Sequence, residues 1–123
     1  MKYLCLVYYD EKTMAAMPES DWASLNRECI ACADSLSERG HYAAGQALQS
    51  TETATTLRVR NGRLSTTDGP FAETKEQLAG FYLLEARDLN EAIALASKIP
   101  PARYGCVEIR PIRELDPYRT DAA

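Results

Sequence analysis

The sequence has little of several features whose scarcity excludes whole classes of protein. No apolar run approaches the roughly 20 residues that a membrane-spanning helix requires. The apolar start, residues 2 to 9, leads into charged residues and has no small-residue cleavage site, so we predict no signal peptide and a cytoplasmic location. Basic residues are in deficit, with a formal net charge of −4, whereas nucleic-acid-binding domains normally carry a basic excess. Neither a membrane nor a nucleic acid is therefore an expected partner.

Motifs that carry known chemistry are also scarce. The chain contains no phosphate-binding loop and no GxGxxG, HExxH or GxSxG pattern, and His41 is its only histidine. Cys29 and Cys32 have a CxxC spacing, but a zinc site needs two more ligands at a matching spacing, which Cys5 and Cys106 in predicted strands do not offer. We therefore predict no metal, no cofactor and four free thiols that pack as small core residues.

The first part of the chain predicts a strand followed by a helix. Residues 2 to 9 are apolar at both alternating sets of positions, which is typical of a strand that is covered on both faces. Residues 19 to 38 begin with helix-starting side chains and end before Gly40, a typical C-terminal cap. Their apolar residues recur at helical spacing and form one stripe: Trp22, Leu25, Cys29, Cys32 and Leu36.

The remaining elements complete an α+β pattern. We predict a strand over residues 41 to 49, a β-hairpin over 54 to 66 with its turn at Asn61-Gly62, and a strand over 80 to 86. A helix follows Asp88, which forms a capping box with Glu91, and a last strand spans 105 to 112. Without the inserted hairpin the order is βαββαβ, the ferredoxin-like plan, with both helices on one face of an antiparallel sheet. The 123 residues predict one domain, 1 to 115, and a tail, 116 to 123.

The second face of this sheet needs a cover. The strands at 2 to 9 and 80 to 86 are apolar on the face that the helices leave free. A monomer would expose a large apolar patch, which soluble proteins usually avoid. We therefore predict a homodimer in which a second copy covers this face, sheet against sheet.

Several stretches together resemble one known family. The stretch "TDGPFAETKEQLAGFYLLEARDLNEAIALA", the opening "MKYLCLVYYDE", the hairpin "TATTLRVRNGRL" and the closing "GCVEIRPI" are similar to the DGPF-type branch of the YCII-related proteins. The resemblance covers residues 1 to about 115. It implies a ferredoxin-like fold that pairs as a dimeric α+β barrel. It also implies an enzyme-like cleft with a His-Asp pair, and an association with alternative sigma factors in stress or regulation.

Two residues are the candidates for proton transfer. His41 has the side chain best suited to act as a general base near neutral pH, and Asp68 has a carboxylate that can orient such a ring. Each residue also has a purely structural interpretation. A histidine at a strand edge is often only half exposed, and an aspartate before a glycine commonly fixes a turn by binding backbone amides.

The loop that contains Asp68 also contains candidates for ligand binding. Phe71 lies in a polar loop, so its ring is expected either to plug the core or to line a pocket. The charges near it are equally typical of a solvated surface cluster. Small residues at 43 to 47 predict a hollow beside the bulky strands, or else the close approach of a helix. The candidate ligand-binding residues are Tyr8, Gln49, Phe71, Glu73, Lys75 and Tyr82.

Three functions are compatible with these residues. The first is a small cofactor-independent enzyme, of isomerase or lyase type, that uses His41 and Asp68 for proton transfer on a small organic molecule. The second is a non-catalytic dimer that binds a small ligand or a regulatory partner, to which Arg58, Arg60 and Arg63 offer an anion-binding surface. The third is a stable dimer without any pocket.

Overall fold

The computed structural model describes residues 1–118. The predicted tail, 116–123, therefore lies mostly outside the described residues. Four strands form one antiparallel sheet: β1 (Lys2–Tyr9), β2 (Tyr42–Ala47), β5 (Gln77–Glu85) and β6 (Gly105–Pro111). Their order in the sheet, β2-β5-β1-β6, is the order of a ferredoxin-like βαββαβ fold.

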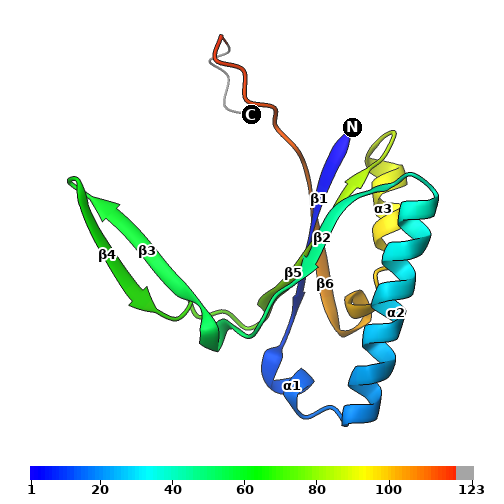
Figure 1. Ribbon diagram of the computed structural model, residues 1–123, viewed down its shortest axis with the longest axis horizontal. Coiled ribbons are helices and arrows are strands. Elements are labelled where there is room, and N and C mark those ends of the chain that lie inside the picture. Colours follow the sequence, from blue (N-terminus) through cyan, green and yellow to red (C-terminus); the bar gives the residue numbers. More distant parts are fainter. Residues whose placement is uncertain (119–123) are drawn as a thin grey trace.

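Two helices cover one face of this sheet, as predicted (Figure 1). Helix α2 (Glu19–Glu38) has the predicted bounds, and α3 (Leu89–Ala96) begins at the predicted capping box. The Asp88 carboxylate accepts from the amide of Glu91, and the Glu91 carboxylate accepts from the amide of Arg87. Gly40, with φ of 78°, ends α2 in the left-handed conformation that glycine tolerates best.

Three short elements were absent from the sequence-based prediction. They are helix α1 (Glu11–Ala15) and the 3-10 helices η1 (Thr51–Thr53) and η2 (Pro100–Tyr104). Each spans five residues or fewer, which is too short for an apolar repeat to become visible. Helix α1 begins at Asp10, whose carboxylate accepts from the amide of Lys12.

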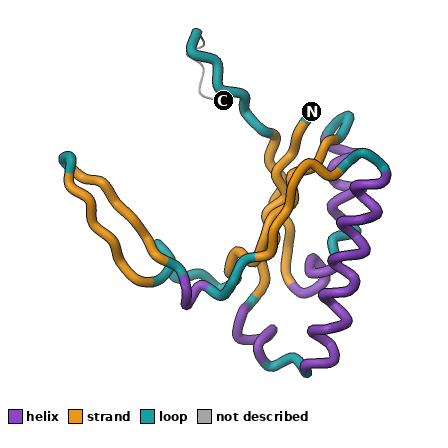
Figure 2. Tube along the Cα trace, viewed as in Figure 1, coloured by secondary structure: helices purple, strands orange, loops and turns teal. Residues whose placement is uncertain are grey.

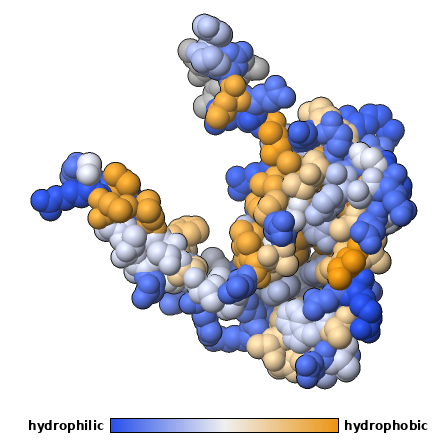
Figure 3. Space-filling view, viewed as in Figure 1, coloured by the Kyte–Doolittle hydropathy of each residue, from blue (hydrophilic) through white to orange (hydrophobic). Residues whose placement is uncertain are grey.

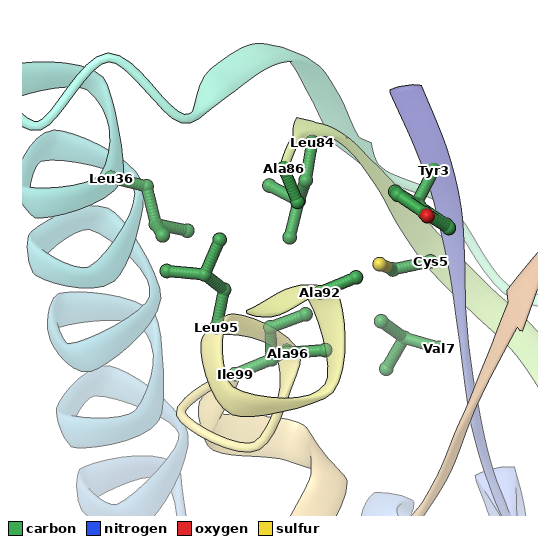
Figure 4. Packing of buried hydrophobic residues seen from close by; sticks show 10 residues of the cluster. All are labelled: Tyr3, Cys5, Val7, Leu36, Leu84, Ala86, Ala92, Leu95, Ala96 and Ile99. Atoms are coloured by element: carbon green, nitrogen blue, oxygen red, sulfur yellow. The ribbon is translucent and has the colours of Figure 1, made fainter. Parts of the chain in front are cut away.

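The hydrophobic core lies between the sheet and the two helices. Figure 4 shows the side chains of Tyr3, Cys5 and Val7 pointing from β1 toward α3 and the inner face of α2. Leu84 and Ile99 are the largest side chains that are fully buried. Cys5 is buried here as predicted, whereas Cys106 is exposed on the outer face of β6.

Within residues 1–118, no helix lies on the other face of the sheet. Figure 1 shows the sheet nearly edge-on, with α2 and α3 on one side only. Strand pairing places Leu4, Leu6 and Tyr8 of β1 on the free face beside Phe81 and Leu83 of β5, and all five are only partly buried. The prediction of strands that are apolar on both faces is therefore confirmed.

Strands β3 (Thr55–Arg60) and β4 (Arg63–Asp68) form a separate two-stranded hairpin. Asn61 and Gly62 have φ angles of 52° and 74°, the positive pair that a type I′ turn requires. Figure 2 shows that the hairpin projects away from the main sheet and is joined to it by loops.

Candidate functional site

The candidate site is a cavity of about 1120 Å³ between the sheet and residues 22–33 of α2. Helix α1 closes one end, and β2 and β5 form the floor. The rim consists of two segments: residues 47–52, from the end of β2 into η1, and residues 74–77, up to the start of β5. The same two segments lead into and out of the β3–β4 hairpin, so they connect the hairpin to the cavity.

Aromatic rings form much of the cavity wall. Tyr9 and Trp22 meet edge to face, with ring centroids 6.5 Å apart, and Tyr42 and Tyr82 do the same at 6.1 Å. The Trp22 indole donates to the carbonyl oxygen of Met14 at 3.1 Å, which ties α2 to α1. Both aromatic pairs line the cavity, so its walls present broad apolar rings that are held in fixed orientations.

Three weakly acidic side chains of the cavity are held in their neutral forms. Burial raises the pKa of the Tyr82 phenol, and the nearby thiols of Cys29 and Cys32 raise it further. Burial, followed by Glu11 and Cys29, raises the pKa of Tyr9. Burial and then Cys32 raise the pKa of the Cys29 thiol. Near neutral pH these groups are uncharged hydrogen-bond donors, not nucleophiles.

A carboxylate fastens the rim of the cavity. Glu11 accepts hydrogen bonds from the Ser50 hydroxyl at 3.1 Å and from the amide and hydroxyl of Thr51, each at 2.9 Å. The amide of Glu11 donates to the side-chain carbonyl of Gln77, also at 2.9 Å. Glu11 therefore connects α1 to both rim segments.

Small residues of β2 make room for the cavity. Gly45 and Ala47 line it. A Cβ atom on Gly45 would lie only 2.6 Å from the Tyr42 hydroxyl, which donates to the Gly45 carbonyl oxygen at 3.1 Å. The small-residue segment therefore accommodates the Tyr42 ring and leaves a hollow beside it.

Three of the predicted ligand-binding residues line this cavity: Gln49, Lys75 and Tyr82. Tyr8, by contrast, lies on the free face of the sheet. Side chains alternate between the two faces along a strand, and the residues on either side of Tyr8 face the helices. Phe71 is 80% exposed and neither plugs the core of this chain nor lines the cavity. Glu73 is likewise exposed outside the cavity.

His41 and Asp68 lie on different sheets of the fold. His41 precedes β2, and its Nδ1 lies 2.9 Å from the Glu85 carbonyl oxygen. A carbonyl only accepts, so this contact places a proton on Nδ1 and leaves Nε2 as the basic nitrogen of the neutral ring. Asp68 ends β4, opposite Thr55 in the hairpin. One chain therefore does not bring the two side chains together.

The bend after Asp68 is fixed by hydrogen bonds at Gly69 and not by the aspartate. The amide of Gly69 donates to the Ala54 carbonyl at 2.7 Å, and the Thr56 hydroxyl donates to the Gly69 carbonyl at 2.8 Å. Gly69 has φ of 98°, which favours glycine. Within the described residues the Asp68 carboxylate has no hydrogen-bond partner, so the turn-fixing interpretation of Asp68 finds no support.

Comparison with known proteins gives the family. The model of the YCII-related domain matches residues 1–116. The chain belongs to the YCII-related domain family. An uncharacterised protein of Rhizobium meliloti (strain 1021) is similar to this YCII-related domain, with 37% identity over 114 residues that cover 91% of the chain and 92% of the relative.

Residues 1–118 of this YCII-related domain contain neither a cluster that could hold a metal ion nor a helix that could span a membrane. In that range no group of three or more His, Cys, Asp or Glu side chains is placed to hold a metal ion. The helices described are also too short or too polar to cross a membrane.

Several cavity residues of this YCII-related domain were not predicted as site residues. Trp22 and Cys29 were assigned to a packing stripe of α2, and Glu11 and Met14 belong to the helix that the sequence did not reveal. The stripe itself contained no signal that separates the residues of the cavity from those of the core. Trp22 and Cys29 have the same helical phase as Leu25 and Leu36, yet only the two leucines are buried.

Proposed function

We propose that this YCII-related domain is a homodimer that binds a small, largely apolar organic molecule in the cavity between α2 and the sheet. The single observation that carries the proposal is the cavity of about 1120 Å³ with its two fixed aromatic pairs. Pockets for small organic ligands typically measure roughly 300 to 1000 Å³ and have mainly apolar walls with a few polar groups. The cavity has this composition and is ample for such a ligand.

The polar groups of the cavity favour a particular ligand chemistry. Tyr9 and Tyr82 are neutral phenols, and Lys75 on the rim adds a cationic donor. Donors on the walls suit a ligand that carries oxygen acceptors, and flat aromatic walls suit a flat ring system. The expected ligand is an aromatic molecule with hydroxyl or carbonyl oxygens.

The dimer is proposed on the basis of the free face of the sheet. An apolar surface lies there that none of the described helices covers, formed by Leu4, Leu6, Phe81 and Leu83. Two such faces packed together would give the dimeric α+β barrel that the resemblance to the DGPF-type branch implies. Membership of that branch, based on Asp68-Gly69-Pro70-Phe71, is part of the same proposal.

Binding of 2-naphthol, measured by calorimetric titration and by saturation-transfer NMR, tests the ligand proposal. Ala33→Phe places a ring in the cavity and is expected to weaken binding at least tenfold. Ala31→Phe is the matched control, because Ala31 lies on the same helix but outside the cavity, and it should leave binding unchanged. Equal effects of both substitutions, or no binding of 2-naphthol and related phenols and quinones, would contradict the proposal.

Proton transfer by His41 and Asp68 stays a prediction, as does the link to sigma factors. The specific observation in favour of a catalytic His41 is the Glu85 carbonyl, which orients the ring and leaves Nε2 basic. Catalysis by the pair would require a second copy to bring its Asp68 to His41. If the wild type converts a bound phenol or quinone to a product, His41→Ala should lose this conversion and still bind 2-naphthol. That result would favour a catalytic role over ligand binding without catalysis.

A further inference from the structure

The β3–β4 hairpin has two chemically distinct faces. In its register Val59 pairs with Leu64, and Leu57 lies two residues before Val59, so these three side chains share one face. Arg58, Arg60 and Arg63 occupy the other face. The three apolar side chains are 60% (Leu57), 55% (Val59) and 65% (Leu64) exposed. The hairpin is therefore an amphipathic ribbon whose apolar face is uncovered in one chain.

The hairpin lacks support from the rest of the described chain. Its two strands pack on each other, and within residues 1–118 neither makes an extensive contact with another helix or strand. An isolated two-stranded hairpin is at best marginally stable in water, because it has no second layer in which to bury its apolar side chains. A folded hairpin of this length thus requires an external surface.

The apolar face of the hairpin and the free face of the sheet border one opening. Figure 3 shows apolar surface on the hairpin and on the side of the sheet that it faces. The segment after β6 extends on this side too, and its Ile112 and Leu115 are exposed. More than half of the exposed large apolar side chains lie on the hairpin, on the loop after it or on this segment.

The surface area of the chain also indicates a missing partner. The chain exposes 8986 Å², whereas the scaling for compact monomers gives roughly 6600 Å² for this size. The chain thus has about a third more surface than a compact monomer. Stable interfaces bury roughly 800 Å² on each partner, so the excess is large enough for one.

Charge favours a second copy of this chain as the occupant. The hairpin carries three arginines and Asp68, a net charge of +2 within a chain of −4, so the remainder of the chain carries −6. The hairpin is opposite in charge to the body on which its apolar face would be laid, so the approach of the two is electrostatically favourable. In a two-fold dimer, moreover, a single interface satisfies both hairpins and both sheet faces.

From these observations we infer that the β3–β4 hairpin is an arm that clasps the second copy of the chain. The sheets meet at their free faces, and each arm lays its Leu57, Val59 and Leu64 face on the other copy. This inference rests on the proposed dimer. Because the arm is rooted in segments 47–52 and 74–77, its seating also fixes the rim of its own cavity.

Sedimentation equilibrium of three variants tests the arm separately from the sheet interface. Leu57→Ser combined with Leu64→Ser should raise the dimer dissociation constant at least tenfold. The matched control, Leu89→Ser combined with Ile93→Ser, removes two similarly exposed side chains from α3 and should leave the constant unchanged. Leu6→Glu, in the centre of the free sheet face, should also dissociate the dimer.

The outcomes distinguish the two proposals. A wild-type dissociation constant in the arm variant, with dissociation by Leu6→Glu, would overturn the arm and keep the dimer. Wild-type protein that is monomeric at micromolar concentration would overturn both. Hydrogen exchange of wild-type residues 55–68 gives an independent measurement should the arm variant fail to fold. Their amides should be protected at high protein concentration and should lose at least tenfold protection when the dimer is diluted. An exchange rate that does not depend on protein concentration would overturn the arm.

Discussion

Glu11 and Thr51, forty residues apart in the sequence, are joined by two hydrogen bonds of 2.9 Å. One bond comes from the backbone amide of Thr51 and the other from its hydroxyl, and Ser50 supplies a third to the same carboxylate. Hydrogen bonds to a charged acceptor contribute roughly 1.5 to 3 kcal/mol each where they are shielded from water, and less on a surface. This contact therefore decides how firmly the cavity rim is held.

Glu11→Ala should loosen the rim without unfolding the domain. We expect amide exchange of residues 51–54 to rise at least tenfold and the free energy of unfolding to fall by about 1 to 3 kcal/mol. Glu52→Ala removes an exposed carboxylate from the same segment and should change neither quantity appreciably. Exchange measured by mass spectrometry, together with urea unfolding, checks both expectations. Similar exchange in the two variants would show that Glu11 does not hold the rim.

Gly105→Ala should be one of the most damaging small substitutions in the chain. A Cβ atom at Gly105 would lie 1.9 Å from the carbonyl oxygen of Tyr8 on the neighbouring strand, so β1 and β6 would have to separate. Gly62→Ala is the comparison, since a Cβ there meets open space and suffers only from its φ of 74°. We expect a loss above about 3 kcal/mol for Gly105→Ala and about 1 to 2 kcal/mol for Gly62→Ala. Urea unfolding gives both values, and the reverse order would refute the close approach of the two strands.

The regular elements of the fold were predictable because each has a local signal. The apolar stripe and Gly40 defined α2, the Asp88 capping box defined α3, and Asn61-Gly62 defined the hairpin turn. Helix α1 has a single capping residue, Asp10, but no apolar repeat or capping box beside it. It is five residues long, and Met14 is its only buried residue.

The site was less predictable, because the cavity depends on which strand face a residue occupies and on distant contacts. Tyr82 and Tyr8 are similar residues in similar apolar strands, yet the pairing of β1 with β5 turns Tyr82 toward the helices and Tyr8 away from them. His41 and Asp68 were paired as an acid-base couple on chemical grounds alone, but His41 precedes β2 of the main sheet and Asp68 ends β4 of the separate hairpin. No local pattern contains such information.

Tyr82→Phe should weaken the binding of 2-naphthol and leave the fold intact. The substitution removes one neutral donor from the cavity wall and keeps the ring that packs edge to face on Tyr42. A hydrogen bond of this kind is worth about 0.5 to 1.5 kcal/mol, so the dissociation constant should rise roughly three- to tenfold. Tyr8→Phe makes the same change on the free face of the sheet and should have no effect on binding. Calorimetric titration of both variants decides the matter, and a loss shared by both would place the ligand outside the cavity.

Cys5 should make the stability of the domain fall at alkaline pH. The thiol is fully buried, and burial raises its pKa from the ordinary 9.0 to about 11. In the unfolded chain the thiol ionises near its ordinary value, whereas in the folded chain it stays protonated. Its contribution to stability is therefore complete below about pH 9 and is lost as the pH rises toward 11.

A shift of this size corresponds to about 2 to 3 kcal/mol. Cys5→Ala removes a buried sulfur atom, so it should be less stable than the wild type at pH 7. It also lacks the ionisable group, so the stability of the wild type should approach that of the variant as the pH rises. Urea unfolding of both proteins between pH 7 and 11 measures the difference. Two stability curves that stay parallel across this range would mean that the Cys5 thiol ionises equally well in the folded and unfolded chains, and that the packing of β1 against α3 does not exclude water from it.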